Sequence, residues 1–496
     1  MAANREIKLK LMVNKGSDRV VYAECDSKFV DVLFSFLTMP MGAIIHLSGK
    51  ETKMGCMDGL YQSVEALDER FFQSKACKSM LLRPRSSTEL KCANLAVNYV
   101  ADPTGYCLYG CSDHPSCGIN RRLVSYYNDC QCSCGRIMDR RLNLSYPVGS
   151  IDHGVFVQGK RDFLVTNDLQ VFPLVATSSL FIMKKIGIKD GNSVEGRDVK
   201  IGSQEVLSLL KCSLHSQTAL TDALLSNNIP ITGQVKLKSD QKTFDFVKIE
   251  QTDKGRRMMG KLVMNRSTKQ VLYLEAREDL VNQILSFLTF PLGSVLKLIR
   301  GRSPLLLGCV GNIYEAARDF GTDIDGLLFN SEESKTELLS PKLACLMGCD
   351  DQLLIDHLVE ADFPPLYGSL CHYCFSANID THQYHLCKHA VHKEKLKPIN
   401  PKLPNAVTEK GGGFVKIKTK YMITDDLSVK PLSSFTVLLM MNKYKVTTDE
   451  LEEQDISIGE EVAARILRAS MTSNTVFTDV FFSPGKRFRS GSLGPY

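Results

Sequence analysis

The feature that constrains this chain most is a long internal repeat. Residues 10–47 align without a gap to residues 261–298, and fourteen of these 38 positions are identical. Within them the nonamer FSFLTMPMG at 34–42 returns as LSFLTFPLG at 285–293. Two further blocks recur in the same order: 163–174 as 421–432, and 201–222 as 458–479. Blocks that recur in one order predict a tandem duplication of a domain-sized unit, because solenoid repeats are far shorter.

Each unit opens with the same pattern of secondary structure. Residues 7–13 and 20–25 are β-rich runs around a polar turn, which is typical of a β-hairpin. From Val30 to Leu37 the apolar residues recur at helical spacing, i, i+3, i+4 and i+7. A strand near 162–166 and a helix near 203–214 follow later in the unit. We therefore expect an α+β fold, a tandem duplication of a mixed α/β unit that starts with a β-hairpin and then a helix.

The end of each nonamer reads as the end of a helix. Pro40 and Pro291 lack an N–H group and disfavour helix at the preceding residue. Gly42 and Gly293 are expected to adopt a positive φ as the chain turns away. The nonamer is thus predicted to be structural rather than a phosphate loop or a catalytic turn.

The repeat also gives domain boundaries. Residues 226–258 are polar and predict a linker, and the Gly/Ser/Pro-rich tail is basic and predicted to be disordered. The predicted organisation is a first copy at 5–225 with a Cys-rich insertion at 105–138, a linker at 226–258, a second copy at 259–483 and a tail at 484–496.

Composition narrows the class of protein. The net charge is +6 over 496 residues and the isoelectric point is near 8.4, far from the charge density of a dedicated nucleic-acid binder. The N-terminus has no apolar signal core, and no run of 18 apolar residues predicts a membrane span. We expect a cytoplasmic or nuclear protein whose 17 cysteines stay reduced.

The strongest chemical signal is the segment 105–138. It contains six cysteines and one histidine: Cys107, Cys111, Cys117, Cys130, Cys132, Cys134 and His114. Two cysteine groups separated by about a dozen residues suit a tetrahedral structural zinc site of the ribbon or knuckle type. The spacing is not a regular pair of CxxC motifs, so the ligand choice stays open at this point. Incidental core thiols and redox chemistry are the alternatives.

A weaker metal signal occurs in the second copy, within residues 371–392. Cys371, Cys374 and Cys387, together with His385 or His389, could form a second zinc site. The alternative is a decayed copy of the first ribbon with solvated histidines.

Catalytic signals are weak. The chain contains no P-loop, no G-x-S-x-G and no H-E-x-x-H motif. Asp168 recurs as Asp426, and Asp222 recurs as Asp479. Nothing in the sequence places a second carboxylate or a histidine beside them, so caps of turns or helices are the favoured interpretation.

Basic and aromatic residues flank the cysteines. They are Arg121, Arg122, Arg136, Arg140, Arg141, Tyr126 and Tyr127. Such residues can contact phosphates and stack on bases. Nearby aspartates offset the positive charge, so a solvated surface is the favoured alternative.

The N-terminal block, the CSCGRIM segment at 132–138, FLVTNDLQVFP at 163–173 and the duplicated layout resemble a plant-specific family catalogued as domain of unknown function 674. The resemblance implies an intracellular plant protein without an assigned activity. It also implies the metal ligands Cys107, Cys117, Cys132 and Cys134, with Cys111 and Cys130 as alternates. For the second site the expected metal ligands are Cys371, Cys374, Cys387 and His389.

These observations lead to one functional hypothesis and two alternatives. We expect a non-enzymatic binding or scaffolding protein with a structural zinc, a protein partner and no contact with a membrane. An enzyme with one active copy, the first, is one alternative. A zinc-containing nucleic-acid-binding protein is the other.

Overall fold

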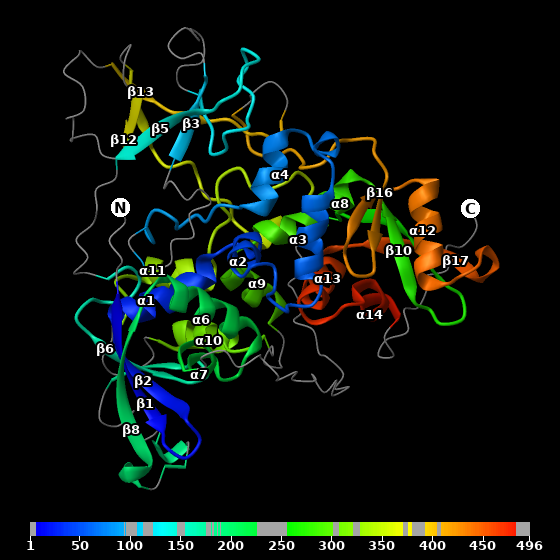
Figure 1. The fold of residues 1–496 in the computed structure, drawn as a ribbon. Coiled ribbons are helices and arrows are strands. Elements are labelled where there is room, and N and C mark those ends of the chain that lie inside the picture. Colours follow the sequence, from blue (N-terminus) through cyan, green and yellow to red (C-terminus); the bar gives the residue numbers. More distant parts are fainter. Residues whose placement is uncertain are drawn as a thin grey trace.

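The computed structural model places helices and antiparallel sheets in one mixed α and β architecture (Figure 1). It describes residues 6–93, 95, 107–112, 123–145, 154–174, 180, 183–185, 187–188, 190–225, 255–300, 307–320, 328–370, 375–378, 392–403 and 408–482. Within these ranges no helix is both long enough and apolar enough to cross a membrane.

The first sheet is antiparallel, with strand order β7-β6-β2-β1-β8. Its strands are β1 (Ile7–Asn14), β2 (Arg19–Asp26), β6 (Asp162–Thr166), β7 (Val171–Pro173) and β8 (Val194–Ile201). Alternate side chains of β1 are buried, as expected for a strand with one face on the core. The predicted N-terminal hairpin is therefore present, and the predicted strand at 162–166 is β6.

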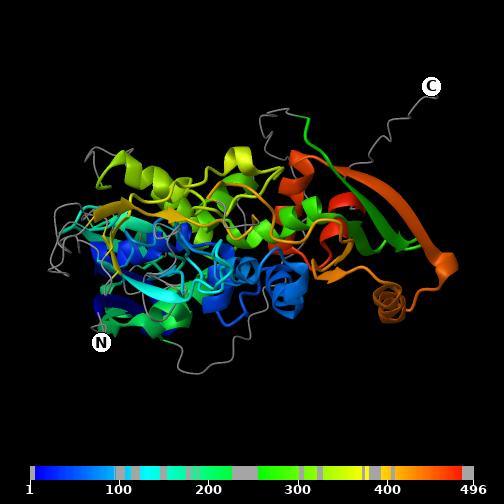
Figure 2. The ribbon, with the colours of Figure 1, turned by 90° about the horizontal axis from the view of Figure 1, so that it is seen from above.

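The second sheet has the corresponding order, β16-β15-β10-β9-β17. Its strands are β9 (Met258–Asn265), β10 (Val271–Ala276), β15 (Tyr421–Thr424), β16 (Val429–Pro431) and β17 (Leu451–Ile458). Figure 2 shows the two sheets at opposite ends of an elongated molecule, with helices between them.

A third sheet combines strands from the two halves of the chain, in the order β13-β11-β12-β5-β3. Its strands are β3 (Cys107–Gly110), β5 (Arg140–Ser145), β11 (Tyr367–Leu370), β12 (Phe375–Asn378) and β13 (His392–Lys395). β5 and β12 pair in parallel, and so do the short strands β4 (Leu123–Val124) and β14 (Lys397–Pro398). The Cys-rich segment of the first half thus shares one sheet with the second half.

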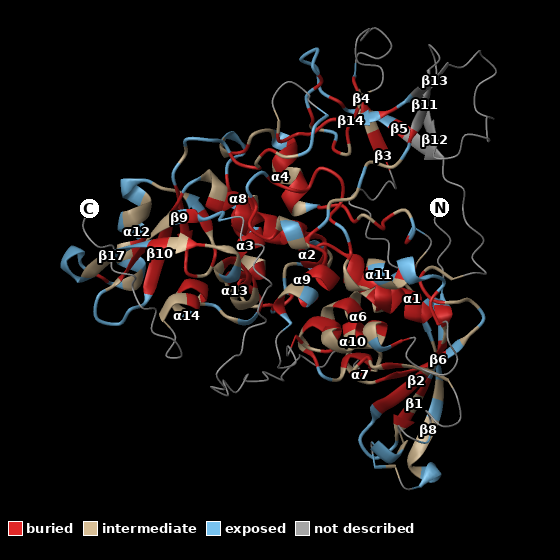
Figure 3. Ribbon diagram, turned by 180° about the vertical axis from the view of Figure 1, so that it is seen from behind, coloured by how far each residue is buried: buried red, intermediate tan, exposed pale blue. Residues whose placement is uncertain are grey.

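Most of the helices lie between the first two sheets, and Figure 3 shows that the central ones are largely buried. The α-helices are α1 (Ser27–Ser35), α2 (Met41–Leu47), α3 (Met57–Ala66), α4 (Lys75–Leu82), α6 (Ser203–His215), α7 (Ala219–Leu224), α8 (Glu278–Ser286), α9 (Leu292–Ile299), α10 (Val310–Asp319), α11 (Glu332–Leu339), α12 (Ser434–Tyr444), α13 (Glu460–Thr472) and α14 (Val476–Phe482). Short 3₁₀ helices are η1 (Phe36–Thr38), η2 (Glu69–Phe71), η4 (Gly191–Ser193), η5 (Phe287–Thr289), η6 (Ile355–His357) and η8 (Thr448–Glu450).

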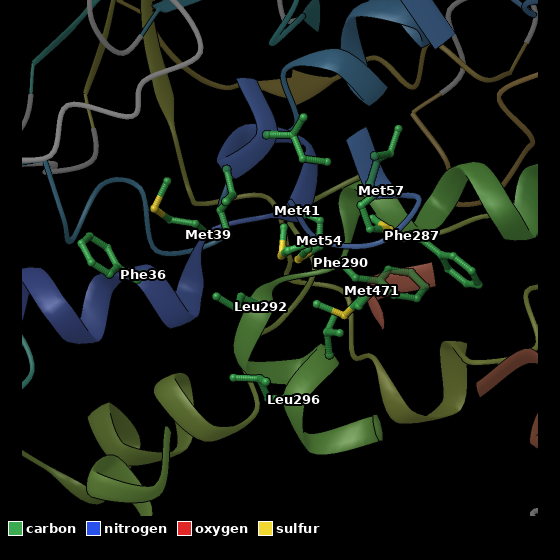
Figure 4. Close-up of a cluster of buried hydrophobic side chains, with 14 of the residues drawn as sticks. Phe36, Met39, Met41, Met54, Met57, Phe287, Phe290, Leu292, Leu296 and Met471 are labelled. Carbon is green, nitrogen blue, oxygen red and sulfur yellow. The ribbon is translucent and has the colours of Figure 1, made fainter. Parts of the chain in front are cut away.

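The two nonamers contact each other at the centre of the molecule. Pro40 and Pro291 form an antiparallel bridge. The N–H of Met41 donates to the carbonyl of Phe290 at 3.0 Å, and the N–H of Leu292 donates to the carbonyl of Met39 at 2.9 Å. Figure 4 shows the side chains of Met39, Met41, Phe290 and Leu292 packed together in the core. The repeated stretch is therefore an interface between the two halves of the chain.

The expected positive φ at the nonamer glycines is wrong. Gly42 and Gly293 lie in the first turns of α2 and α9, and neither has a positive φ. A Cβ atom on Gly42 would lie 2.7 Å from the carbonyl oxygen of Leu81, and one on Gly293 would lie 2.4 Å from that of Leu338. Glycine is needed because another backbone approaches closely.

The helices that follow each nonamer pack on the sheet of the other half. α10 contacts β7 of the first sheet, and α3 contacts β16 of the second. The N–H of Cys309 donates to the carbonyl of Ser213 at 2.8 Å, and the N–H of Cys56 donates to that of Ser470 at 2.8 Å. An edge strand of each sheet, and the helix α6 or α13 of the same half, thus contact a segment from the other half of the chain.

Candidate metal centre

Three cysteines of the Cys-rich segment meet at one point. The Sγ atoms of Cys111, Cys132 and Cys134 all lie within 4.8 Å of one another, and those of Cys111 and Cys134 are 3.4 Å apart. Cys111 and Cys132 are buried, whereas Cys134 is exposed. We call these residues the cysteine cluster.

A short hairpin over residues 130–138 presents two of the three thiols. The N–H of Met138 donates to the carbonyl of Cys130 at 2.8 Å, and the N–H of Cys132 donates to that of Arg136 at 2.8 Å. The turn closes when the N–H of Gly135 donates to the carbonyl of Cys132 at 2.8 Å. Gly135 has a φ of 86°, a conformation that glycine adopts at little cost. The CSCG sequence therefore folds into a tight turn with both thiols near its tip.

The third thiol arrives from the end of β3. The backbone of Tyr109 exchanges two hydrogen bonds of 2.8 Å with that of Ser125. Beyond Cys111, the N–H of Ser112 donates to the carbonyl of Ile137 at 3.0 Å. This last hydrogen bond fixes the end of the strand against the hairpin and brings Cys111 to the other two cysteines.

The donor set fits a zinc ion. Zn–S bonds of about 2.3 Å in a tetrahedron hold the sulfur atoms about 3.8 Å apart. This separation lies between two distances in the cluster. The Sγ atoms of Cys111 and Cys134 are 3.4 Å apart, and the largest separation of any two Sγ atoms is at most 4.8 Å. Thiolates are the ligands that borderline-soft Zn²⁺ prefers in structural sites. The cluster can supply three of four ligands.

The cluster differs in part from the set expected from the sequence. It contains Cys132 and Cys134, and it contains Cys111, which was an alternate. Cys107 is buried four residues earlier along the strand, a distance of about 13 Å at the usual rise per residue. Cys130 also lies outside the cluster. The extended geometry of the strand keeps Cys107 and Cys111 too far apart to share one site, and this is the signal that could have favoured Cys111 over Cys107.

Other expected ligands lie outside the described residues. Cys117 and His114 of the first segment are among them, and so is the whole second site with Cys371, Cys374, Cys387, His385 and His389. These remain predictions from the sequence.

Several thiols outside the cluster are not activated. Burial raises the pKa of Cys56, Cys130, Cys309 and Cys345 to about 12. Such thiols are protonated near neutral pH, and the thiol is a far weaker nucleophile and metal ligand than the thiolate.

The recurring aspartates stabilise turns. The carboxylate of Asp168 accepts hydrogen bonds from the side chains of Thr166 and Gln170. Its aligned residue Asp426 accepts hydrogen bonds from Thr424 and from the backbone of Ser428. Asp222 and Asp479 likewise accept hydrogen bonds from Ser216 and Ser473, the serines that end α6 and α13. These partners assign the aspartates to local structure, as the sequence favoured.

The aromatic residues near the cluster are engaged in packing. The guanidinium of Arg85 lies 4.3 Å from the ring centre of Tyr126. Tyr127 is buried, and its hydroxyl donates to the carbonyl of Arg83 at 3.4 Å. Arg136 and Arg141 are exposed, whereas Arg121 and Arg122 lie outside the described residues. This arrangement does not offer the two tyrosine rings for stacking on bases.

Comparison with known proteins gives a family and no activity. A family model described as "Protein of unknown function (DUF674)" matches residues 3–461. No curated protein gives a significant match, and no solved structure does. Because the family model covers most of the 496 residues, the chain belongs to the DUF674 family.

Proposed function

We propose that this protein is a non-enzymatic binding or scaffolding protein whose Cys-rich sheet is stabilised by a structural zinc ion. The observation that carries the proposal is the convergence of the Sγ atoms of Cys111, Cys132 and Cys134 within 4.8 Å. A zinc ion binds cysteines as thiolates and would hold the three sulfur atoms together by direct bonds. A bound zinc would fix the end of β3 against the hairpin that presents the other two thiols.

The fourth ligand separates a structural site from a reactive one. A closed site has four protein ligands, whereas catalytic zinc keeps one position open. Cys117 is the fourth thiolate that the family resemblance implies, and it lies outside the described residues. We propose a closed site with Cys117 as its fourth ligand.

Metal content and single substitutions test the zinc site. Purified protein is expected to contain about one zinc per chain by mass spectrometry if the second predicted site is not a metal site. The C111S variant is expected to lose this zinc, and C117S is expected to weaken it. The matched control is C107S, because Cys107 is equally buried on the same strand but lies outside the cluster. Zinc that persists in C111S but disappears in C107S would refute the cluster as the site.

We also propose that the two halves are copies from a tandem duplication. The gapless alignment of 10–47 with 261–298 and the matching order of strands in the first two sheets support this history. The reciprocal hydrogen bonds between the nonamers add to it. On this proposal the Cys-rich insertion is the main difference between the copies.

A protein partner is favoured by one exposed surface. Phe435, Leu438 and Leu439 are 68%, 57% and 50% exposed, and their spacing places them on one side of α12. The opposite side of the helix packs through the buried Met440 on the second sheet. We call the three exposed residues the α12 ridge. Exposed apolar clusters of this kind commonly mark protein contacts, and we propose that the ridge receives an apolar segment of another protein.

Comparative affinity capture tests the ridge. We first identify a partner that the wild-type protein captures and then measure its binding as a purified protein. The affinity of this partner for the L438E variant should be at least about tenfold weaker than its affinity for the wild-type protein. V359E is the matched control, because Val359 is also an exposed apolar residue but lies outside α12. Equal binding of the partner to wild type and L438E would refute the assignment.

A further inference from the structure

A groove crosses the first sheet where β2 extends beyond its neighbour. β6 pairs with β2 only from Asp26 to Tyr22, so residues 19–21 continue without a partner strand on that side. The β6–β7 turn at 166–170 and the α6–α7 turn at 217–218 flank this part of β2, where the N–H of Asn167 donates to the carbonyl of Val21 at 3.3 Å and the N–H of Val20 donates to the hydroxyl of Thr221 at 2.9 Å. The groove has a volume of about 430 Å³, which is within the usual range for small-molecule sites. Figure 1 shows these elements together at the outer end of the first half.

The groove combines an apolar wall with polar groups. Val21 and Phe172 lie on the same face of the sheet and supply the apolar surface. Arg19 and Lys185 supply the two cations, and both are exposed. Such a lining suits a ligand with an apolar body and a polar end.

The two cations are not neutralised by carboxylates. Among the residues that the structure describes, Arg19 has no ion pair and no side-chain hydrogen bond. Its neighbour Asp18 pairs instead with Arg197 at 2.8 Å. The ammonium of Lys185 donates to the neutral amide oxygen of Gln170 at 3.2 Å.

Among the described residues that line this groove, Asp168 is the only one with a carboxylate, and that carboxylate is hydrogen-bonded within the protein. Asp168 accepts hydrogen bonds from Thr166, from Gln170 at 2.7 Å and from the amide of Asn312 at 3.3 Å. These donors are neutral and leave the negative charge of Asp168 in place, so Arg19, Lys185 and Asp168 together give the described lining a net charge of +1.

The aligned region of the second sheet lacks this character. Arg19 aligns with Gln270, and Asn167 aligns with Asp425, whose carboxylate accepts hydrogen bonds from Phe477 and Thr478. Both differences make the first region more positive. Lys443 of α12, beside the second sheet, lies 3.7 Å from Asp426, so the cation there has a carboxylate partner. Phe172 aligns with Lys430, so the aromatic wall is also specific to the first sheet.

We propose that this groove binds a small organic anion, with an apolar body against Val21 and Phe172 and a carboxylate or phosphate group between Arg19 and Lys185. The guanidinium forms paired hydrogen bonds with either anionic group, and the ammonium adds a second charge. The inference is independent of the zinc site, since none of the cysteines of the cluster lines the groove.

Titration with matched probes tests the proposal. Benzoate and phenyl phosphate are the anionic probes, and benzyl alcohol is the neutral probe, with binding to the full chain measured by calorimetry or ligand-observed NMR. We expect at least one anion to bind at millimolar or lower concentration and benzyl alcohol to bind at least about tenfold more weakly. Preference for one anion identifies the class of ligand. Equal binding of all three probes, or binding of none, would overturn the proposal.

Substitutions place the binding in the groove. R19Q introduces the residue that the second sheet carries at the aligned position, and we expect it to weaken anion binding about tenfold or more. K185Q is expected to weaken binding less, because its ammonium already has a partner. K430Q removes an exposed cation from the second sheet and should leave binding unchanged. If K430Q weakens binding as much as R19Q does, the attraction is a general charge effect and the groove is not the site. Circular dichroism verifies that each variant is folded.

Discussion

Asp31 in α1 makes a pH dependence of stability predictable. The residue is 1% exposed, and its carboxylate accepts hydrogen bonds of 2.6, 2.8 and 3.1 Å from the backbone N–H groups of residues 155–157. Burial raises the pKa of Asp31 from 3.8 to about 6, although the hydrogen bonds and Lys91 oppose the increase. The folded chain therefore binds this proton more tightly than the unfolded chain, and ionisation favours unfolding. The contribution of Asp31 to stability is present below pH 3.8 and is lost as the pH rises through about 6.

The structure also gives the size of the effect. The two pKa values differ by about 2.2, and one pKa unit corresponds to about 1.36 kcal/mol, so the upper limit is about 3 kcal/mol. D31N has no charge to bury and should lack this dependence. The aligned residue Asn282 shows that an amide can occupy such a place, since its oxygen accepts hydrogen bonds of 2.8 and 3.2 Å from Phe414 and Val415. D31N loses one of the three hydrogen bonds, a pH-independent cost of about 1 kcal/mol.

Urea unfolding of both proteins at several pH values between about 4 and 7.5 measures the difference. We expect the stability of D31N relative to wild type to increase by up to about 3 kcal/mol across this range. The reverse variant N282D should acquire the dependence that D31N loses. A difference between D31N and wild type that stays constant over the whole range would refute the reasoning.

Two further substitutions follow from close packing and buried charge. G42A places a methyl group 2.7 Å from a backbone carbonyl oxygen, so we expect thermal unfolding to show a loss of about 1–3 kcal/mol. The control is G59A inside α3, where the methyl group would make only an ordinary contact of 3.5 Å with the carbonyl oxygen of Asp426, and it should gain up to about 1 kcal/mol. A G42A protein as stable as G59A would contradict the close-approach argument. E89Q leaves the guanidinium of Arg85 buried without its charged partner and should cost about 3–5 kcal/mol in chemical unfolding. The control is E337Q, because Glu337 forms a partly exposed ion pair with Lys91, and this variant is expected to lose at most about 1 kcal/mol of stability. Equal losses of stability in E89Q and E337Q would be inconsistent with a buried pair of Arg85 and Glu89.

Local structure was predictable from the sequence because it depends on periodicity. The hairpin of β1 and β2, the helix α6 and the strand β6 all appear where the apolar patterns place them. These patterns depend on which side of each element is buried, and one sequence contains that information. The aspartates in turns were predictable for the same reason, since their partners lie within a few residues.

The candidate site was only partly predictable. Six cysteines in one segment indicate a metal, but the choice among them depends on whether the chain between two cysteines is extended or turned. A strand separates Cys107 from Cys111 by about 13 Å, whereas a turn brings Cys132 and Cys134 together. The groove at Arg19 was not predictable, because its walls come from four parts of the chain that the sequence does not show to be neighbours.

The contact between the nonamers explains why their small and rigid residues are the identical ones. Each nonamer is the other's neighbour, so Pro40 faces Pro291, and a Cβ on Gly42 would lie 3.1 Å from the carbonyl oxygen of Leu288. A Cβ on Gly293 would lie 3.1 Å from that of Leu37. A side chain added to either glycine would displace both backbones, whereas the apolar positions can exchange methionine for phenylalanine or leucine because flexible side chains repack. Close approach of two backbones therefore fixes proline and glycine in both halves.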